Sequence, residues 1–419
     1  MKLAAWLQYL ETLHPFVIDM GLDRIRSVAD KLQLDLADAC KITIAGTNGK
    51  GSTAAFLEAL LRKSGHTVGL YRSPHLQSYN ERILINGKMA TDESICAAFT
   101  RIEEVRADIS LTYFEFGTLA AMLIFAEQKL DYLVLEVGLG GRLDAVNLLD
   151  ADLALITNIA LDHTEWLGDS REQIGLEKAG IMRRGKTLLY GEVDMPLSIR
   201  QQAQKLEAPF YQYARDFQAE LRAGVFHWQG YDAAGASLRL ALECDPYSLS
   251  ELFPANAALA LQAFFQLKLS LNAQAIVDSW RGVFIPGRFQ IIEREAHTLI
   301  LDVAHNPHAM QLCVENLHRH FPSRKVRLVL AMLQDKDHQQ AIEILAPNVD
   351  AWYVAGLSNS RGSQAKILYN ALQAMGQSRV NAYESVEEAF LAAESSMQAG
   401  EILLVTGSFY TVAAVLESL

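Results

Sequence analysis

The sequence predicts an α/β protein with two domains. The first is an N-terminal, P-loop-type domain with a doubly wound, mostly parallel sheet, and the second is a smaller, C-terminal, Rossmann-like α/β domain. Three observations predict this fold: apolar runs alternate with helical patterns through the 419 residues, a glycine-rich turn joins one such run to a helix, and a Pro-Gly break divides the chain. This alternation is typical of parallel sheets that bind ligands at the carboxyl ends of their strands.

The N-terminal part carries four strand-like runs, each followed by a turn or a helix. They cover residues 41–45, 67–71, 132–137 and 153–158. Helical patterns follow at about 52–64 and 256–269. The segment from about 195 to 247 alternates aromatic and polar residues, which predicts an antiparallel insertion.

A second alternating series begins after the break at Ile285-Pro286-Gly287-Arg288, where we place the domain boundary. Its strands are expected at 298–303, 326–332, 352–355 and 402–406. The predicted domains are therefore residues 1–286 and 287–419.

Composition narrows the possible partners and location of the protein. Lysine and arginine total 37 against 49 aspartate and glutamate residues, and the net charge of -12 disfavours nucleic acid as a partner. No segment approaches the ~18 apolar residues of a membrane span, and the N-terminus lacks a signal peptide pattern, so we expect a cytoplasmic protein without membrane contact. The dispersed cysteines (Cys40, Cys96, Cys244 and Cys313) indicate neither zinc nor disulfides and are expected to be core thiols.

The glycine-rich turn is the most informative local feature. Residues 41–53 read K-I-T-I-A-G-T-N-G-K-G-S-T. Gly46, Gly49 and Gly51 let backbone N–H groups face an anion, Lys50 adds a positive charge, and the helix offers its N-terminal dipole. The alternative is a plain strand-to-helix loop. Because glycine follows the lysine where a metal-binding hydroxyl normally stands, metal ligation must come from elsewhere.

Glu136 ends an apolar strand in L-D-Y-L-V-L-E-V-G. A buried carboxylate needs a cation or hydrogen-bond donors, so next to a phosphate site it indicates a magnesium ligand, with a structural ion pair as the alternative. The glycines that follow resemble a dinucleotide fingerprint, but Leu143 occupies the position of its last glycine, which excludes NAD.

Three further polar segments are ordinary when each is taken alone. His163, which follows Asp162, is typical of a hydrogen-bonded histidine in a loop. Lys178 is typical of a solvated charge on a helix, and residues 71–75 are typical of a loop after a strand. They gain meaning from the order in which they occur.

Eight strings occur in the order seen in the folylpolyglutamate synthase family, relatives of the Mur ligases, and the sequence resembles that family over both halves. They are A-G-T-N-G-K-G-S-T, R-S-P-H-L, L-T-Y-F-E-F-G-T, L-E-V-G-L-G-G-R-L-D-A, A-L-D-H-T-E-W-L-G, E-K-A-G-I, P-G-R-F-Q and D-V-A-H-N-P-H. The resemblance implies an ATP-dependent ligase in which a substrate carboxylate is phosphorylated and the amine of L-glutamate then attacks the acyl phosphate. It implies ATP, two magnesium ions and optionally K+ as cofactors, and a monomer acting on dihydropteroate, reduced folates and glutamate. The first domain would bind ATP and the pterin or folate, and the second would bind glutamate.

The resemblance also assigns roles to residues of the first domain. The nucleotide would be held by Thr47, Asn48, Gly49, Lys50, Gly51, Ser52 and Asn256, and magnesium by Ser73, Glu136, His163 and a carbamylated Lys178. Carbamylation would remove an electrostatic difficulty, because an ammonium ~4 Å from a unit positive charge is repelled by roughly 4 kcal/mol at an effective dielectric of 20.

In the second domain, the resemblance places Arg288 and Asp302 on the nucleotide and His305 and Ser408 on the incoming glutamate. Without it, Arg288 would be interpreted as a surface arginine, and His305 and Ser408 as polar residues at strand ends. The implied catalytic set is Lys50, His163, Lys178, Asp302 and His305.

Three segments would contact the pterin: Asp19-Met20-Gly21-Leu22, Thr112-Tyr113-Phe114-Glu115 and Leu143-Asp144-Ala145. Aromatic rings can stack on a flat heterocycle, although Tyr113 and Phe114 are also compatible with a helix core. The D-M-G-L stretch favours the branch of the family that also uses dihydropteroate.

Three alternatives stay open. A folylpolyglutamate synthase without dihydropteroate activity would use the same site. Another Mur-type ligase would need an extra N-terminal domain, for which the ~40 residues before the phosphate loop leave no room. A non-catalytic NTP-binding module would not need the ordered residues Asp302, His305 and Ser408.

Overall fold

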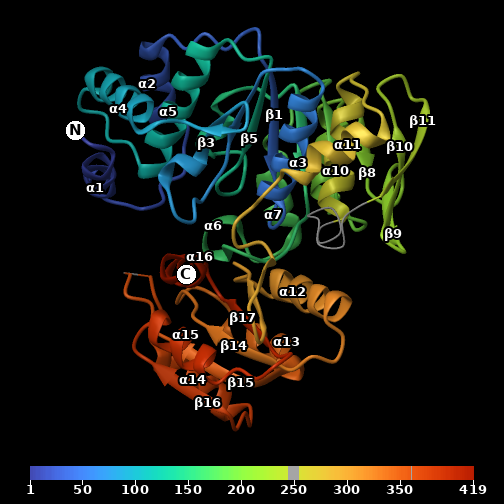
Figure 1. Cartoon of the computed structure of the whole chain (residues 1–419). Helices are drawn as coiled ribbons and strands as arrows, with labels where there is room; N and C mark the ends of the chain where they lie inside the picture. The colour runs from blue at the N-terminus through green and yellow to red at the C-terminus, as the bar shows by residue number, and fades with distance from the viewer. Residues whose placement is uncertain (244–253, 360) are drawn as a thin grey trace. The chain divides into compact units, whose positions relative to one another are not determined.

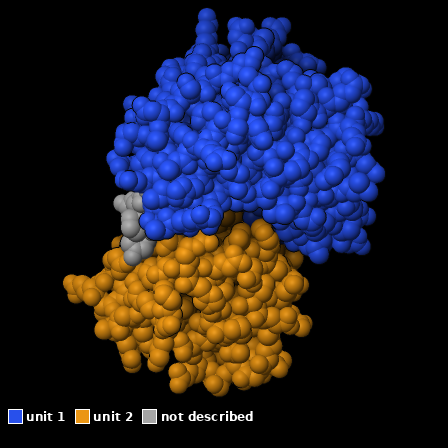
Figure 2. Space-filling view, turned by 90° about the vertical axis from the view of Figure 1, so that its right-hand side faces the viewer, with its two compact units in different colours: residues 1–284 blue, residues 285–419 orange. Residues whose placement is uncertain are grey.

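The computed structural model describes residues 1–243, 254–359 and 361–419. The chain divides into two compact units, Met1–Phe284 and Ile285–Leu419, which are coloured blue and orange in Figure 2. The assignment of ATP and pterin to the first domain and of glutamate to the second stays a prediction.

Unit 1 contains an eight-stranded sheet in the order β4-β3-β2-β5-β1-β6-β7-β8. Figure 1 labels β3, β5, β1 and β8 of this sheet. The six strands from β2 to β8 in this order are parallel, and β3 and β4 form an antiparallel edge. Their bounds are β1 Cys40–Ala45, β2 Val68–Tyr71, β3 Ile83–Ile85, β4 Lys88–Met89, β5 Tyr132–Glu136, β6 Leu153–Ile156, β7 Thr187–Tyr190 and β8 Phe210–Gln212. The expected mostly parallel sheet is confirmed.

The central strands are mostly apolar because both faces of the sheet are covered. Successive side chains of a strand point to opposite faces. In β5, Leu133 and Leu135 belong to one core cluster and Val134 to another. One face is covered by α1 Leu3–Leu13, α2 Asp23–Leu32, α4 Asp92–Arg106, α5 Tyr113–Gln128, α7 Arg171–Ala179 and α8 Leu197–Lys205, and the other by α3 Lys50–Lys63, α10 Pro254–Gln266 and α11 Ala273–Arg281.

The antiparallel insertion is shorter than the sequence suggests. The expected segment, 195–247, begins with α8 and β8, which extend the parallel sheet, and its last four residues lie outside the described part of the chain. Its antiparallel part consists of β9 Gln218–Arg222, β10 Val225–Tyr231 and β11 Ser237–Glu243, in the order β11-β10-β9. This small sheet packs through Phe226 and Trp228 against α10 and α11.

Unit 2 contains a six-stranded sheet in the order β12-β13-β17-β14-β15-β16, parallel except for β12. Its strands are β12 Gln290–Glu293, β13 Thr298–Leu301, β14 Val326–Leu330, β15 Val349–Ala355, β16 Val380–Tyr383 and β17 Ile402–Thr406. Its helices are α12 Pro307–His320, α13 His338–Leu345, α14 Ala365–Ala374, α15 Val386–Ser395 and α16 Phe409–Ser418. The expected second α/β domain is therefore present.

The cysteines fit the expected core positions only in part. Cys313 is buried, whereas Cys40 and Cys96 are half-buried; Cys244 lies outside the described residues. Within the described ranges, no helix combines the length and apolar character that crossing a membrane requires.

Candidate functional site

The glycine-rich turn connects β1 to α3, as its sequence predicts. The backbone has φ values of 146° at Gly46 and 82° at Gly49, in the region that favours glycine. A Cβ atom on Gly46 would lie 1.8 Å from Thr157 Oγ1, and one on Gly49 would lie 2.4 Å from Asn256 Oδ1. Both positions therefore require glycine, and the side chain of Asn256 lies against the turn.

Helix α3 begins at Lys50, two residues earlier than the sequence pattern indicates. Its first N–H groups have no acceptor within the helix and carry the positive end of the helix dipole. Gly49 precedes them as the N-cap residue without a side-chain cap. The start of α3 thus has the composition and geometry of an anion site.

Lys50 and Lys178 both reach the carbonyl oxygen of Gly46. Lys50 Nζ donates to it at 3.1 Å and to the Thr47 carbonyl at 3.2 Å, and Lys178 Nζ donates to it at 3.0 Å. Burial, reinforced by the positive charge of Lys50, lowers the pKa of Lys178 to about 7, although Asp162 and Asp144 act in the opposite direction. A fraction of Lys178 is therefore a neutral amine near neutral pH.

Glu136 lies at the end of β5 beside the start of α3. Its Oε2 accepts the backbone N–H of Ser73 at 3.2 Å, and the same oxygen would lie 3.4 Å from a Cβ atom on Gly51. The carboxylate is buried. The structure therefore brings Glu136, Ser73 and the glycine-rich turn together.

His163 lies in the loop that follows β6. It adopts a left-handed conformation with φ 52° and precedes the short helix α6 Thr164–Leu167. Its backbone N–H donates to Asp162 Oδ1 at 2.9 Å, and its ring Nε2 lies 4.0 Å from Asp162 Oδ2. Asp162 thus orients the segment that carries the histidine.

The predicted metal ligands offer a hydroxyl, a carboxylate and an imidazole, which suit magnesium or manganese. Among residues 1–243, 254–359 and 361–419, no group of three or more histidine, cysteine, aspartate or glutamate side chains could hold a metal ion. As an ammonium, Lys178 is no ligand. Carbamylation would turn it into a carboxylate-like ligand, so the set fits a metal best when Lys178 carries this modification.

The three predicted pterin segments lie close to one another. Arg24 joins two of them, because Nη1 pairs with Asp19 Oδ2 at 2.7 Å and Nη2 with Glu115 Oε1 at 3.1 Å. The methyl carbon of Met20 would lie 3.4 Å from a Cβ atom on Gly140.

Phe114 closes the remaining side of this cluster. Its ring packs on Gly138, where a Cβ atom would come within 2.6 Å, and lies 6.0 Å from the ring of Tyr71. Tyr113 packs instead beside Tyr79, with 5.9 Å between ring centroids. Phe114 therefore borders the glycine-rich loop after β5, as Met20 does.

Several polar residues of the pterin set also hold the local backbone. Thr112 and Glu115 form a capping box at the start of α5, with Glu115 N to Thr112 Oγ1 at 3.2 Å and Thr112 N to Glu115 Oε2 at 2.8 Å. Asp144 accepts the N–H groups of Leu139 and Val146, both at 2.9 Å. Burial raises the pKa of Asp144 to about 6. Gly21, Leu22 and Leu143 are half-buried beside them, and Ala145 is buried.

In unit 2, Asp302 and His305 follow β13. Asp302 is buried and accepts the N–H groups of Phe289 at 2.8 Å and Ala304 at 2.7 Å, and burial raises its pKa. His305 Nδ1 lies 2.9 Å from the carbonyl oxygen of Val303.

The ring of Phe409 lies beside two of the predicted residues of unit 2, Arg288 and His305. The Arg288 guanidinium lies 5.0 Å from its ring centroid, and the His305 ring lies 6.0 Å from it. Ser408 precedes Phe409 and caps α16 through Thr411 N, at 3.0 Å. The expected residues of the second domain therefore gather at the carboxyl ends of β13 and β17.

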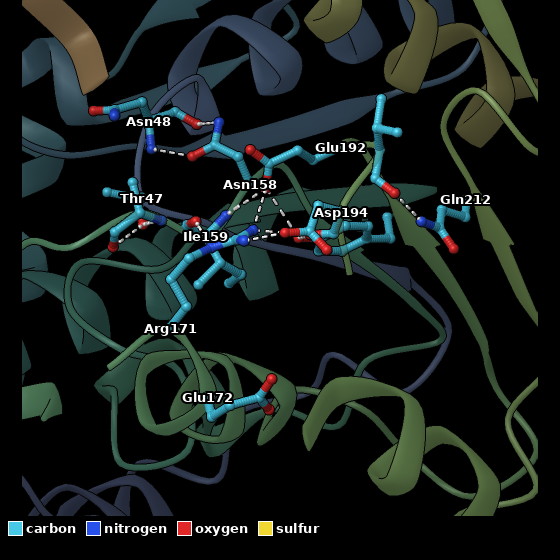
Figure 3. Close-up of polar contacts among 12 residues, drawn as sticks. Thr47, Asn48, Asn158, Ile159, Arg171, Glu172, Glu192, Asp194 and Gln212 are labelled. Atoms are coloured by element: carbon cyan, nitrogen blue, oxygen red, sulfur yellow. Dashed lines mark hydrogen bonds and ion pairs between the residues drawn. The ribbon is translucent and has the colours of Figure 1, made fainter. Parts of the chain in front are cut away.

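Sequence reasoning missed Thr157, Asn158 and Arg171. Thr157 and Asn158 were assigned to a strand, but β6 ends at Ile156 and both side chains turn to the phosphate loop. Figure 3 shows Asn158 beside Asn48 and Arg171 beside Glu192 and Asp194. The available signal was a pair of polar residues directly after an apolar strand, in I-T-N-I-A-L-D-H.

Comparison with known proteins agrees with this geometry. Residues 44–234 match the Mur ligase middle domain and residues 287–409 the Mur ligase glutamate ligase domain. The dihydrofolate synthase/folylpolyglutamate synthase of Escherichia coli (strain K12) is 42% identical over 415 residues, which cover 99% of this chain and 95% of the relative.

Solved structures give the same result. The structure described as E. coli FolC in complex with DHPP and ADP has a TM-score of 0.92 and 41% identity, covering 100% of this chain and 97% of that one. A bifunctional folylpolyglutamate synthase/dihydrofolate synthase with Mn, AMPPNP and L-glutamate bound has a TM-score of 0.90 and 43% identity, covering 100% and 98%.

The fold, the two matched domains and the phosphate loop define a Mur-type, ATP-dependent ligase. The degree of identity over the whole length is more specific. The chain belongs to the dihydrofolate synthase/folylpolyglutamate synthase family.

Proposed function

We propose that the protein ligates L-glutamate to dihydropteroate, forming dihydrofolate, and to the γ-carboxylate of reduced folates, through an acyl phosphate. One observation carries the proposal. The predicted site residues of unit 1 gather at the carboxyl ends of β1, β2, β5 and β6. These ends carry the glycine-rich turn with Lys50 and the buried Glu136, and Lys178 and the three predicted pterin segments pack against their loops. Its relatives include an E. coli FolC structure with DHPP and ADP bound.

The reaction consists of two displacements. A carboxylate oxygen of the substrate attacks the γ-phosphorus of ATP, and the bond to the bridging oxygen breaks to release ADP. The glutamate amine then attacks the acyl carbon, the carbon–oxygen bond to phosphate breaks, and the amine loses its proton as the amide forms. Because a free carboxylate is a poor acylating agent, the first step provides the leaving group for the second.

The phosphate loop would position the nucleotide for the first step. The N–H groups at the start of α3 would bind phosphate oxygens, and Lys50 would move from the Gly46 carbonyl to the transferred group. Thr47, Asn48, Gly49, Gly51 and Ser52 would shape this cradle, and Asn256, whose amide lies on Gly49, would border the nucleotide.

Ser73, Glu136, His163 and carbamylated Lys178 would hold divalent metal, which supplies neutralisation of phosphoryl charge when bound. The lowered pKa of Lys178 supports the modification, since only the neutral amine reacts with carbon dioxide. The carbamate would then offer oxygen ligands where the ammonium would repel a metal ion.

Unit 2 would supply the acceptor. His305 and Ser408 would bind the glutamate that attacks, and Arg288 and Asp302 would contact the nucleotide. We further propose that the protein works as a cytoplasmic monomer and that K+ is an optional activator.

The test is phosphate release from ATP with dihydropteroate, tetrahydrofolate or neither, each with and without L-glutamate. Release that requires both a pterin substrate and glutamate supports the proposal. Glutamate-dependent release with tetrahydrofolate but not with dihydropteroate would indicate a folylpolyglutamate synthase without dihydropteroate activity. Glutamate-independent release, or none, would contradict ligase function altogether.

A further inference from the structure

We propose that Thr157 and Asn158 are positioning residues that fix the phosphate loop in the shape that binds nucleotide. Both side chains hold the backbone of Asn48, and we call Thr157, Asn158 and Asn48 together the Asn48 clamp. The proposal rests on the proposed function in requiring that this loop binds ATP.

Asn158 engages both backbone groups of Asn48 through its side-chain amide (Figure 3). Asn158 Oδ1 accepts the Asn48 N–H at 3.0 Å, and Asn158 Nδ2 donates to the Asn48 carbonyl oxygen at 2.9 Å. The amide therefore pairs with the loop as a neighbouring strand would. An aspartate has no donor for the carbonyl, and an alanine reaches neither group.

Thr157 adds a second donor to the same carbonyl. Its Oγ1 lies 2.6 Å from the Asn48 oxygen, and the residue is buried. The hydroxyl occupies the space where any residue but glycine at position 46 would place its Cβ atom, 1.8 Å away. The absence of a side chain at Gly46 thus makes room for the hydroxyl that holds Asn48.

The main chain beside the clamp continues this contact. Thr47 N donates to the Asn158 carbonyl at 3.0 Å, and Ala160 N donates to Thr47 Oγ1 at 3.0 Å. The N–H groups of Thr47 and Asn48 are therefore directed into the protein. Phosphate donors would come from the start of α3, whose first N–H groups lack helical acceptors.

Arg171, the first residue of α7, holds the residue that follows the clamp, Ile159 (Figure 3). Arg171 Nε donates to the Ile159 carbonyl at 2.8 Å, and Nη2 pairs with Glu192 at 3.2 Å. Glu192 Oε2 also accepts the Ile159 N–H at 3.2 Å and the Tyr190 hydroxyl at 3.0 Å. The residue after Asn158 is thus held at both its backbone groups, which leaves the clamp little freedom to move away from the loop.

Nucleotide affinity distinguishes a positioning role of these residues from general stabilisation of the fold. A residue that only stabilises the fold changes the melting temperature, whereas a residue that shapes the loop changes nucleotide affinity in protein that remains folded. Thr157→Val removes the hydroxyl at nearly constant volume, and Thr157→Ser restores it. Thr43→Val in β1 is the matched control, because Thr43 is buried and its hydroxyl has no hydrogen-bond partner among the described residues.

The experiment is calorimetric titration of each full-length variant with Mg·ADP, well below its melting temperature, together with amide hydrogen exchange of the phosphate loop. Thr157→Val should weaken binding about tenfold and speed exchange at Asn48, since the Asn48 carbonyl loses its shortest donor. Thr157→Ser and Thr43→Val should bind as the wild type does. Asn158→Asp, at a half-buried position, should weaken binding at least as much as Thr157→Val.

Each outcome decides the matter. Wild-type affinity in both Thr157→Val and Asn158→Asp, even with lower melting temperatures, would overturn the clamp and leave the proposed function standing. If the wild type itself does not bind Mg·ADP, both are overturned. Should Thr157→Val fail to fold, Asn158→Asp decides by the same affinity criterion.

Discussion

The ammonium groups of Lys50 and Lys178 converge on one acceptor, the carbonyl oxygen of Gly46, at 3.1 and 3.0 Å. Two like charges at one oxygen repel each other, and Lys178 is buried besides. This arrangement costs stability in the unmodified protein. It also leaves part of Lys178 as a neutral, reactive amine near neutral pH, because the pKa of Lys178 is lowered to about 7.

Lys178→Met should raise the melting temperature at pH 7 while abolishing ligase activity. The folded pKa of Lys178 lies below the usual value of 10.5, so the unfolded chain binds more protons between about pH 7 and 10.5. Stability of the unmodified protein therefore rises with pH across this window, by up to ~1.4 kcal/mol per pH unit for this group. Below pH 7 both states bind the proton, and the full penalty remains.

Melting curves between pH 6.5 and 9.5 in carbon dioxide-free buffer measure this effect. The variant should show a flatter dependence on pH than the wild type. Lys186→Met is the control, because Lys186 is exposed and pairs with Asp152 at 2.8 Å. A Lys178→Met protein that melts below the wild type at pH 7 would contradict the assigned penalty.

Lys50→Ala should lower the ligase rate by roughly 10²–10³, the usual cost of removing one preorganised donor from a transferred phosphoryl group. Lys50 donates to the backbone carbonyls of Gly46 and Thr47, and the positive φ angles at Gly46 and Gly49 shape the turn, so the turn should persist without the lysine side chain. The measurement is steady-state phosphate release beside a thermal melt. Near-normal activity in a normally melting variant would exclude Lys50 from phosphate binding.

Lys178→Ala should lose most activity and regain part of it in acetate. A small carboxylate can enter the space left by the side chain and replace the oxygen atoms of a carbamate. In the wild type, intact mass measured in bicarbonate should include a species heavier by one carbon dioxide, absent from Lys178→Ala. Acetate that restores Lys50→Ala equally well would show that the rescue is unrelated to position 178.

Asp19→Ala should reduce kcat/KM for dihydropteroate more than for tetrahydrofolate. Asp19 is paired with Arg24 at 2.7 Å and His14 at 3.1 Å, and Arg24 also holds Glu115. Loss of Asp19 should therefore disturb the pterin segments without touching the phosphate loop. Steady-state kinetics with both substrates tests the difference, and Lys50→Ala, which should depress both reactions alike, is the reference. Equal losses in Asp19→Ala would indicate a single shared pocket.

The fold was predictable because its central strands are short and mostly apolar, so their positions stand out in the sequence. Less distinct elements were missed: β3 and β4 are only three and two residues long, and α8 lies inside the segment that suggested an insertion. Local sequence also predicts the glycine-rich turn, because its three glycines and Lys50 are neighbours in the chain.

The remaining site contacts join distant parts of the chain. Asn158 is 110 residues from Asn48, and no local pattern records that its amide will meet that backbone. Asp144 and Glu115 were chosen as ligand-binding residues, yet their carboxylates also accept backbone N–H groups, because a buried carboxylate needs donors in the folded protein. Such dual use depends on three-dimensional packing.

Helix α7 holds Arg171 at its first position and Lys178 one residue before its end. Arg171 is tied to the Ile159 carbonyl and Lys178 to that of Gly46. A helical residue advances ~1.5 Å and turns the side chain by ~100°. Inserting or deleting one residue between them would swing one of the two side chains off its carbonyl, whatever residue was added. The length of this segment is consequently under a constraint as strict as that on the identities of its end residues, and evolution can vary its middle only by substitution.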